Sequence, residues 1–145
     1  MALGDVLAGN LAAYVRKLRW QVDLVVPVPL GRQRLKERGY NQAALLAMPV
    51  AFFQDWYYSP RAVFRIRETR SQVGLTAVER RENIADAFQA DPARVSGKAV
   101  LLVDDVTTTG ATVAACSEAL RKAGARNIYA LTLARALPYH GLQIV

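Results

Sequence analysis

The stretch VLLVDDVTTTGAT, residues 100–112, carries the strongest structural signal in the chain. Its first four residues extend an apolar run that starts at Ala99, which is typical of a buried central strand in a parallel sheet. Two acids and a run of small residues follow this predicted strand, Ala99–Val103, and lead to a predicted helix over 111–123 that Gly124 ends. Strand, loop and helix in this order are the unit from which open α/β sheets are built.

Apolar segments and helical patterns alternate along the rest of the chain. Periodicity predicts helices at 6–19 and 43–58 and from Thr76 onward, where Glu79 completes a capping pattern. Strands are predicted at 23–28, 62–68, 87–90 and 127–133. We expect Pro49 to kink or interrupt the second helix, because proline lacks an amide donor and crowds the preceding turn. The alternation predicts an α/β fold with a mainly parallel open sheet and flanking helices.

Length and composition predict one domain, residues 1–145, because 145 residues with 52% hydrophobic content suffice for one core. No apolar run reaches the roughly 20 residues that span a bilayer, and residues 1–20 lack the pattern of a secretion signal. We therefore expect a cytoplasmic protein without membrane insertion. The single cysteine, Cys116, excludes a disulfide or a cysteine-based zinc site within one chain, and we expect it to be buried.

The net charge of +7 arises in the first part of the chain. Residues 1–81 contain 13 basic and 6 acidic side chains, whereas residues 82–145 contain 6 of each. A concentrated basic surface can bind nucleic acid, an anionic membrane or a polyphosphate ligand, and charge alone does not choose among them.

The residues after the predicted central strand suit a ribose phosphate. Asp104 and Asp105 can accept hydrogen bonds from two vicinal hydroxyls and can assist Mg²⁺ directly or through its water shell. The loop that follows can hold a phosphate, because unpaired amides and the helix dipole favour an anion there. This loop comprises Thr107, Thr108, Thr109, Gly110, Ala111 and Thr112. A surface turn with solvated acids is the alternative for each residue alone, and the complete string in order favours the phosphate site.

The stretch 100–112 resembles the phosphoribosyl-pyrophosphate motif of the type I phosphoribosyltransferases. Three further strings resemble the ComF-type branch of that superfamily: VPVPLGRQRLKERGYNQ at 26–42, RETRSQVGLTAVERRENIADAF at 67–88 and AGARNIYALTLAR at 123–135. The resemblance implies the type I phosphoribosyltransferase fold, phosphoribosyl pyrophosphate as substrate, Mg²⁺, and transfer to a nitrogen acceptor with release of pyrophosphate. Thr108 stands where the 6-oxopurine branch has an aspartate, which argues against a hypoxanthine or guanine enzyme.

The same resemblance implies roles for two basic segments. In the segment after the first strand, it assigns pyrophosphate contacts to Arg34, Arg38 and Gly39, and arginine suits phosphate oxygens because it can bind them in a bidentate manner. The loop 68–76 corresponds to a flexible hood, from which Arg67 or Arg70 would reach the leaving pyrophosphate. Ordinary solvated loops are the alternative for both segments.

The resemblance leaves two classes of function open. One is a magnesium-dependent transferase with an unidentified acceptor, and the other is a non-catalytic module that serves competence and DNA uptake or senses phosphoribosyl pyrophosphate. DNA and the competence machinery are therefore candidate partners, and type I relatives suggest a homodimer. ComF-type chains usually carry a cysteine-rich zinc ribbon before this domain, and the single cysteine here departs from that pattern.

Overall fold

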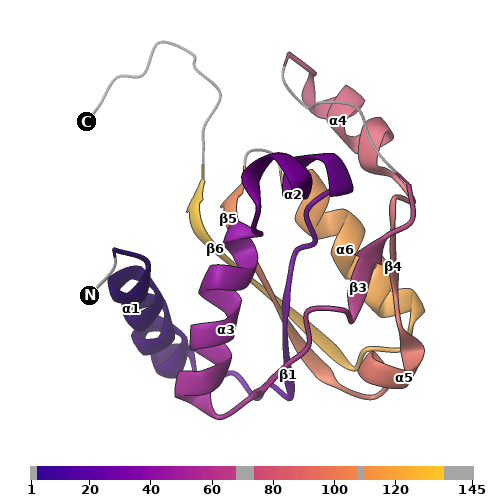
Figure 1. Ribbon diagram of the computed structural model, residues 1–145. Helices are drawn as coiled ribbons and strands as arrows, with labels where there is room; N and C mark the ends of the chain where they lie inside the picture. Colours follow the sequence, from indigo (N-terminus) through magenta and orange to yellow (C-terminus); the bar gives the residue numbers. More distant parts are fainter. Residues whose placement is uncertain (1–2, 68–73, 108–109, 136–145) are drawn as a thin grey trace.

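Four parallel strands form the central sheet in the described part of the computed structural model, which comprises residues 3–67, 74–107 and 110–135. The strands are β1 (Leu24–Pro27), β2 (Tyr57–Tyr58), β5 (Ala99–Thr107) and β6 (Asn127–Arg135). They lie in the order β2-β1-β5-β6, so that the two long strands β5 and β6 are neighbours (Figure 1). All three neighbouring pairs are parallel, which confirms the predicted α/β class with a mainly parallel open sheet.

Helices cover both faces of this sheet. The helices α1 (Leu3–Leu18) and α3 (Gln42–Gln54) pack on one face, and α6 (Ala111–Lys122) packs on the other (Figure 1). Strand β5 serves both cores, because successive side chains of a strand point to opposite faces. Leu101 and Val103 lie among the residues of α1 and α3, whereas Val100 and Leu102 lie among those of α6. All four side chains are fully buried, as expected for a central strand.

A second sheet of two strands packs on the α6 side. Strand β3 (Val63–Arg65) runs antiparallel to β4 (Phe88–Ala90), and Val63 and Phe88 are buried in the core that α6 shares. Between these strands in sequence, α4 (Ala77–Ile84) lies beyond their ends, away from the central sheet (Figure 1). It begins at the predicted cap: the Glu79 amide donates to Thr76 Oγ1 at 3.2 Å, and the Thr76 amide donates to Glu79 Oε2 at 2.7 Å. The short helix α5 (Pro92–Val95) leads to β5.

The segment that forms α3 and β2 differs from its prediction in two ways. Helix α3 continues through Pro49, because the buried residues on either side of the proline, Ala47 and Val50, are held in one core with α1 and β1. The predicted helix ends early, at Gln54, where Asp55 adopts a left-handed conformation with φ of 57°. Tyr57–Tyr58, predicted as helix, instead forms the edge strand β2 beside Leu24 and Val25. A strand of two residues is too short to leave a periodic signal.

Two other segments show features in the structure that the sequence periodicity did not predict. The predicted strand at 62–68 forms as β3, but it pairs with β4 outside the central sheet. The polar and basic segment after β1 contains a short helix, α2 (Arg32–Arg38), none of whose residues is buried. Because a helix without buried side chains has no apolar stripe, its sequence carries no amphipathic pattern.

Candidate functional site

The two acids of the sequence motif lie where β5 outruns its neighbour β1. Val103 is the last β5 residue paired with β1, and it lies opposite Pro27. After one more hydrogen bond, from the Val28 amide to the Val103 carbonyl at 2.8 Å, the segment that follows β1 leaves the sheet. Strand β5 continues through Thr107, and Asp104 pairs with Thr132 of β6. The predicted end of the strand at Val103 is therefore wrong, because pairing with β6 alone extends it. The acids are left at the carboxyl edge of the sheet, where open α/β folds bind ligands.

Asp104 is a half-buried carboxyl group beside a second one. Its Oδ1 accepts a hydrogen bond of 2.9 Å from the Asp105 amide. The pKa of Asp104 is raised to about 7, first by burial and then by the side-chain hydrogen bond and negative charge of Asp105, whereas the backbone hydrogen bond from Asp105 lowers it. An acid with a strongly raised pKa at the open edge of a sheet is a candidate for a functional group.

The residues after the acids begin helix α6 in the predicted place. Thr107 ends β5, and Gly110 is the residue before α6, with φ of 77°. Glycine adopts this left-handed conformation without steric cost because it has no Cβ atom, which explains why a glycine suits position 110. Ala111 and Thr112 form the first turn of α6, and the Ala114 amide donates to the Gly110 carbonyl at 2.9 Å. The predicted phosphate contacts of Thr108 and Thr109 lie outside the described residues.

The donor set at this edge fits Mg²⁺. Within residues 3–67, 74–107 and 110–135, no group of three or more histidine, cysteine or acidic side chains could hold a metal ion by itself. Mg²⁺ does not need such a group, because it usually binds one or two carboxylates together with substrate phosphates and water. Asp104 and Asp105 supply hard oxygen donors of that kind, and a cation would offset the unfavourable proximity of their charges.

The residues predicted to contact pyrophosphate lie on or next to α2. Arg34 and Arg38 are exposed, and Arg38 Nη1 donates to Gln42 Oε1 at 3.0 Å. Gly39 ends α2 with φ of 78°, and its amide donates to the Leu35 carbonyl at 2.7 Å. The structure therefore places Arg34 and Arg38 within a helix and Gly39 at its end rather than in an open loop.

Asn41 ties this segment to the strand before it. Its side-chain amide donates to the Val28 carbonyl at 3.0 Å, and its Oδ1 accepts the Ala43 amide at 3.0 Å at the start of α3. The structure thus shows Asn41 as the cap of the following helix.

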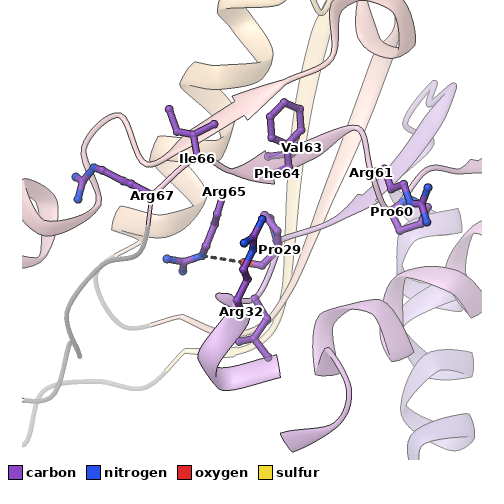
Figure 2. A pocket seen from close by; sticks show the side chains of 10 residues that line it. Pro29, Arg32, Pro60, Arg61, Val63, Phe64, Arg65, Ile66 and Arg67 are labelled. Carbon is purple, nitrogen blue, oxygen red and sulfur yellow. Dashed lines mark hydrogen bonds between the residues drawn. The ribbon is translucent and has the colours of Figure 1, made fainter. Parts of the chain in front are cut away.

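A cleft of about 650 Å³ lies between the segment after β1 and the strand β3, and we call it the arginine cleft. It is lined by Pro29, Leu30, Arg32, Pro60, Arg61, Val63, Phe64, Arg65, Ile66 and Arg67. Figure 2 shows Arg65 and Arg32 on the same side of β3 as Pro29, and the Arg65 Nε donates to the Pro29 carbonyl at 3.4 Å. The Arg65 guanidinium also lies 4.9 Å from the centre of the Phe88 ring.

The arginine cleft contains one residue that the sequence singled out. Arg67 is part of its lining, and its guanidinium donates to the Ala85 carbonyl at the end of α4. Arg70 lies outside the described residues, and Arg34 and Arg38 are not part of the lining. Arg32, Arg61 and Arg65 were missed. For Arg65 the sequence did hold a signal, because Arg65 and Arg67 alternate with apolar residues in a predicted strand and so share one face.

The buried thiol of Cys116 responds to the charges of side chains on both β5 and β3. The cysteine is fully buried in α6, as predicted. Burial raises the pKa of its thiol, the negative charge of Asp104 raises this pKa further, and the positive charge of Arg65 lowers it. Strand β1 links the arginine cleft to the acids: Pro29 and Leu30 of the cleft follow Val28, whose amide donates to the carbonyl of Val103, the residue before Asp104. The arginine cleft therefore begins at the same edge of the sheet as the acids.

None of the helices in the described part of the chain is long and apolar enough to cross a membrane.

Comparison with known families and proteins agrees with this arrangement. Residues 1–139 match the family model described as "Phosphoribosyl transferase domain". Competence protein F of Haemophilus influenzae is 40% identical over 116 residues, which cover 79% of this chain and 51% of that protein. DNA utilization protein YhgH of Escherichia coli K12 is 37% identical over 115 residues, covering 79% of this chain and 50% of that protein. The chain thus spans about half the length of these curated relatives.

A solved structure shows the same fold over most of the chain. The adenine phosphoribosyltransferase of Thermoanaerobacter pseudethanolicus superposes with a TM-score of 0.55 at 16% identity, covering 89% of this chain and 80% of that one. At this identity the likeness concerns the fold alone. It identifies the parallel sheet with its flanking helices as the type I phosphoribosyltransferase fold.

Proposed function

The chain belongs to the phosphoribosyl transferase domain family, and from this premise we propose that it binds 5-phosphoribosyl-1-pyrophosphate with Mg²⁺ at the carboxyl edge of its sheet. The arrangement of β5 and α6 carries the proposal. Asp104 and Asp105 stand at the open end of a buried parallel strand, and Gly110 turns the chain into a helix a few residues later. Acceptors for a diol and a helix start for a phosphate thus follow one another at the edge where such folds bind ligands.

The proposed roles follow from the chemistry of the groups. Asp104 and Asp105 accept hydrogen bonds from the two ribose hydroxyls, and the segment Thr107–Thr112 holds the 5-phosphate. Mg²⁺, when bound, neutralises charge on the pyrophosphate and makes it a better leaving group. Arg34, Arg38 and Gly39 on one side and Arg67 on the other contribute to holding the pyrophosphate. For Arg67 this requires release from the Ala85 carbonyl that it contacts in this structure.

The proposed reaction is a substitution at C1 of the ribose. A nitrogen of the acceptor forms a bond to C1, the bond between C1 and the pyrophosphate oxygen breaks, and its electron pair leaves with the pyrophosphate. The proton on the attacking nitrogen passes to solvent. Little covalent chemistry falls to the protein, whose task is to orient the sugar, hold the leaving group and exclude water.

Calorimetric titration with phosphoribosyl pyrophosphate and MgCl₂ tests the binding proposal. We expect Asp104→Asn/Asp105→Asn to weaken binding by roughly a hundredfold, because asparagine still accepts a hydrogen bond but lacks the charge, which costs about 1–1.5 kcal/mol at each position. Asp55→Asn/Asp86→Asn is the matched control, since both exposed aspartates have a positive φ that asparagine tolerates. Equal affinity of the two double variants would refute the proposed role of the acids.

Release of pyrophosphate, measured over a panel of bases and amines, separates a transferase from a sensor. Turnover with any member of the panel supports catalysis. Tight binding of phosphoribosyl pyrophosphate without turnover on the complete panel favours a sensing module.

The names of the two relatives favour a second candidate, a module that acts in the handling of DNA. The charge of the chain supports this candidate, because the excess of basic residues lies within residues 1–81. Binding to a single-stranded oligonucleotide across a range of salt concentrations tests it, since contacts with phosphates weaken steeply with salt. The homodimer expected from the resemblance stays a prediction that light scattering can test.

A further inference from the structure

The lining of the arginine cleft has an unusual composition. Four of its ten residues are arginines, the other six are apolar, and none is acidic. Within the described part of the chain, Arg61 and Arg67 have no carboxylate partner. Four arginines that line one cleft attract anions, and the apolar residues between them can contact an apolar group, so the cleft is complementary to a negatively charged ligand with an apolar body.

The size and position of the arginine cleft also restrict the kind of ligand that it can bind. A volume of about 650 Å³ falls within the range of sites for small organic molecules, which is roughly 300–1,000 Å³. It is much larger than pyrophosphate needs, and bound Mg²⁺ would already neutralise part of the charge of pyrophosphate. Two lining residues, Pro29 and Leu30, directly follow Val28, whose amide donates to the carbonyl of Val103, the residue before Asp104. The cleft therefore lies near the place proposed for the ribose.

We propose that the arginine cleft binds the acceptor and that this acceptor is an anion: a nitrogen heterocycle carrying a carboxylate or phosphate group. The inference rests on the proposed function, because an acceptor has a meaning only if the ribose site is occupied. The arginines hold the acidic group and the apolar lining contacts the ring. A neutral purine would place no negative charge opposite the guanidinium groups and would gain no charge-assisted hydrogen bond from them, so the cleft discriminates against it.

The test compares ring acids with matched neutral rings on the full chain, in the presence of Mg²⁺ and phosphoribosyl pyrophosphate. Pyridine-3-carboxylate is paired with pyridine-3-carboxamide, and phenyl phosphate with phenol. Amide chemical shifts of the ¹⁵N-labelled protein report binding at Arg61 and 63–67. We expect at least one acid to bind roughly tenfold more tightly than its neutral counterpart, and the preferred acid distinguishes a carboxylate from a phosphate ligand. Equal binding of acid and neutral ring in both pairs would overturn the inference.

Variants of Arg61 provide a second test. We expect Arg61→Gln to weaken binding of the preferred acid by roughly tenfold, and Arg61→Lys to weaken it less, because lysine keeps the charge and loses the bidentate geometry. Arg16→Gln removes the same charge from an exposed position of α1 and is expected to bind as the parent does. Thermal unfolding shows that each variant is folded. Equal affinity of the glutamine variant and the control contradicts the inference.

Other outcomes separate this inference from the proposed function. Loss of phosphoribosyl-pyrophosphate affinity in Arg61→Gln would assign the cleft to pyrophosphate and overturn the acceptor inference while the proposed function stands. Unchanged phosphoribosyl-pyrophosphate affinity in Asp104→Asn/Asp105→Asn would contradict the proposed function instead. A single-stranded oligonucleotide that shifts the same amides and binds more tightly than either acid would assign the cleft to nucleic acid and overturn the inference.

Discussion

The two ends of β5 surround a carboxylate in opposite ways. At the amino end, Asp23 Oδ2 accepts the Ala99 amide at 2.8 Å and lies 3.4 Å from the Arg126 guanidinium. At the carboxyl end, Asp104 accepts one amide and has a second acid beside it, and burial together with that acid raises its pKa to about 7. One carboxylate is paired and helps to hold the sheet together. The other is kept in a position that costs stability, which is expected where a ligand is to bind.

Removing the paired carboxylate should have the largest effect on stability. We expect Asp23→Ala to lower the free energy of unfolding by about 2–3 kcal/mol, because the amide of buried Ala99 loses a charged acceptor and Arg126 loses its partner. Chemical denaturation measures the change, and Glu82→Ala, at an exposed position of α4, is the control. A loss of stability no larger than that of Glu82→Ala would show that Asp23 stabilises the fold no more than an exposed acid does. The contrast between the two ends of β5 would then be wrong.

Neutralising the unpaired carboxylate should have the opposite sign. We expect Asp104→Asn to raise the free energy of unfolding at pH 8 by about 1–2 kcal/mol, because a poorly solvated charge is removed. The pKa of Asp104 is near 3.9 in the unfolded chain and about 7 in the folded one. Between these values the folded chain binds more protons, so the stability that Asp104 contributes falls as pH rises, and the gain from asparagine should nearly vanish at pH 4.

Thermal unfolding at pH 4, 6 and 8 in the absence of Mg²⁺ and ligand measures this dependence. Asp86→Asn, at an exposed aspartate, controls for the loss of a charge. A gain from Asp104→Asn that does not change with pH would show that the two ends of β5 hold their carboxylates alike.

Asn41 offers a smaller test at the carboxyl end of the neighbouring strand β1. We expect Asn41→Ala to lower the free energy of unfolding by about 1 kcal/mol, because α3 loses its cap and the Val28 carbonyl loses a donor. Chemical denaturation at pH 7 measures the loss. A stabilising effect would place Asn41 with Asp104, among the residues that serve a ligand at the expense of the fold.

The smallest effect is expected at a surface ion pair that belongs to neither end. Arg94 Nε lies 3.2 Å from Asp91 Oδ2, and both side chains are substantially exposed. We expect Arg94→Gln to change the free energy of unfolding by no more than about 0.5 kcal/mol. A larger loss would mean that exposed pairs contribute as much as the Asp23 cluster and would weaken the comparison.

Prediction from sequence succeeded where a local pattern has a local cause. The apolar run before Asp104 formed the central strand, Thr76 and Glu79 formed their cap, and Gly110 adopted the left-handed conformation before α6. It failed where the outcome depends on distant partners. Pairing with β6 lengthens β5, packing against α1 and β1 carries α3 past Pro49, and two tyrosines become a strand only because β1 lies beside them.

The amino-acid sequence by itself determined the α/β class, the order of strand, acids, glycine and helix, and the family resemblance, because each is encoded in residues adjacent along the chain. Only the tertiary structure decided that Arg32 and Arg61 join Arg65 and Arg67 in one cleft, and that Asp104 is buried enough to bind a proton near neutral pH. The physical reason is that charge repulsion and burial depend on distances through space, and no spacing along the chain states these distances.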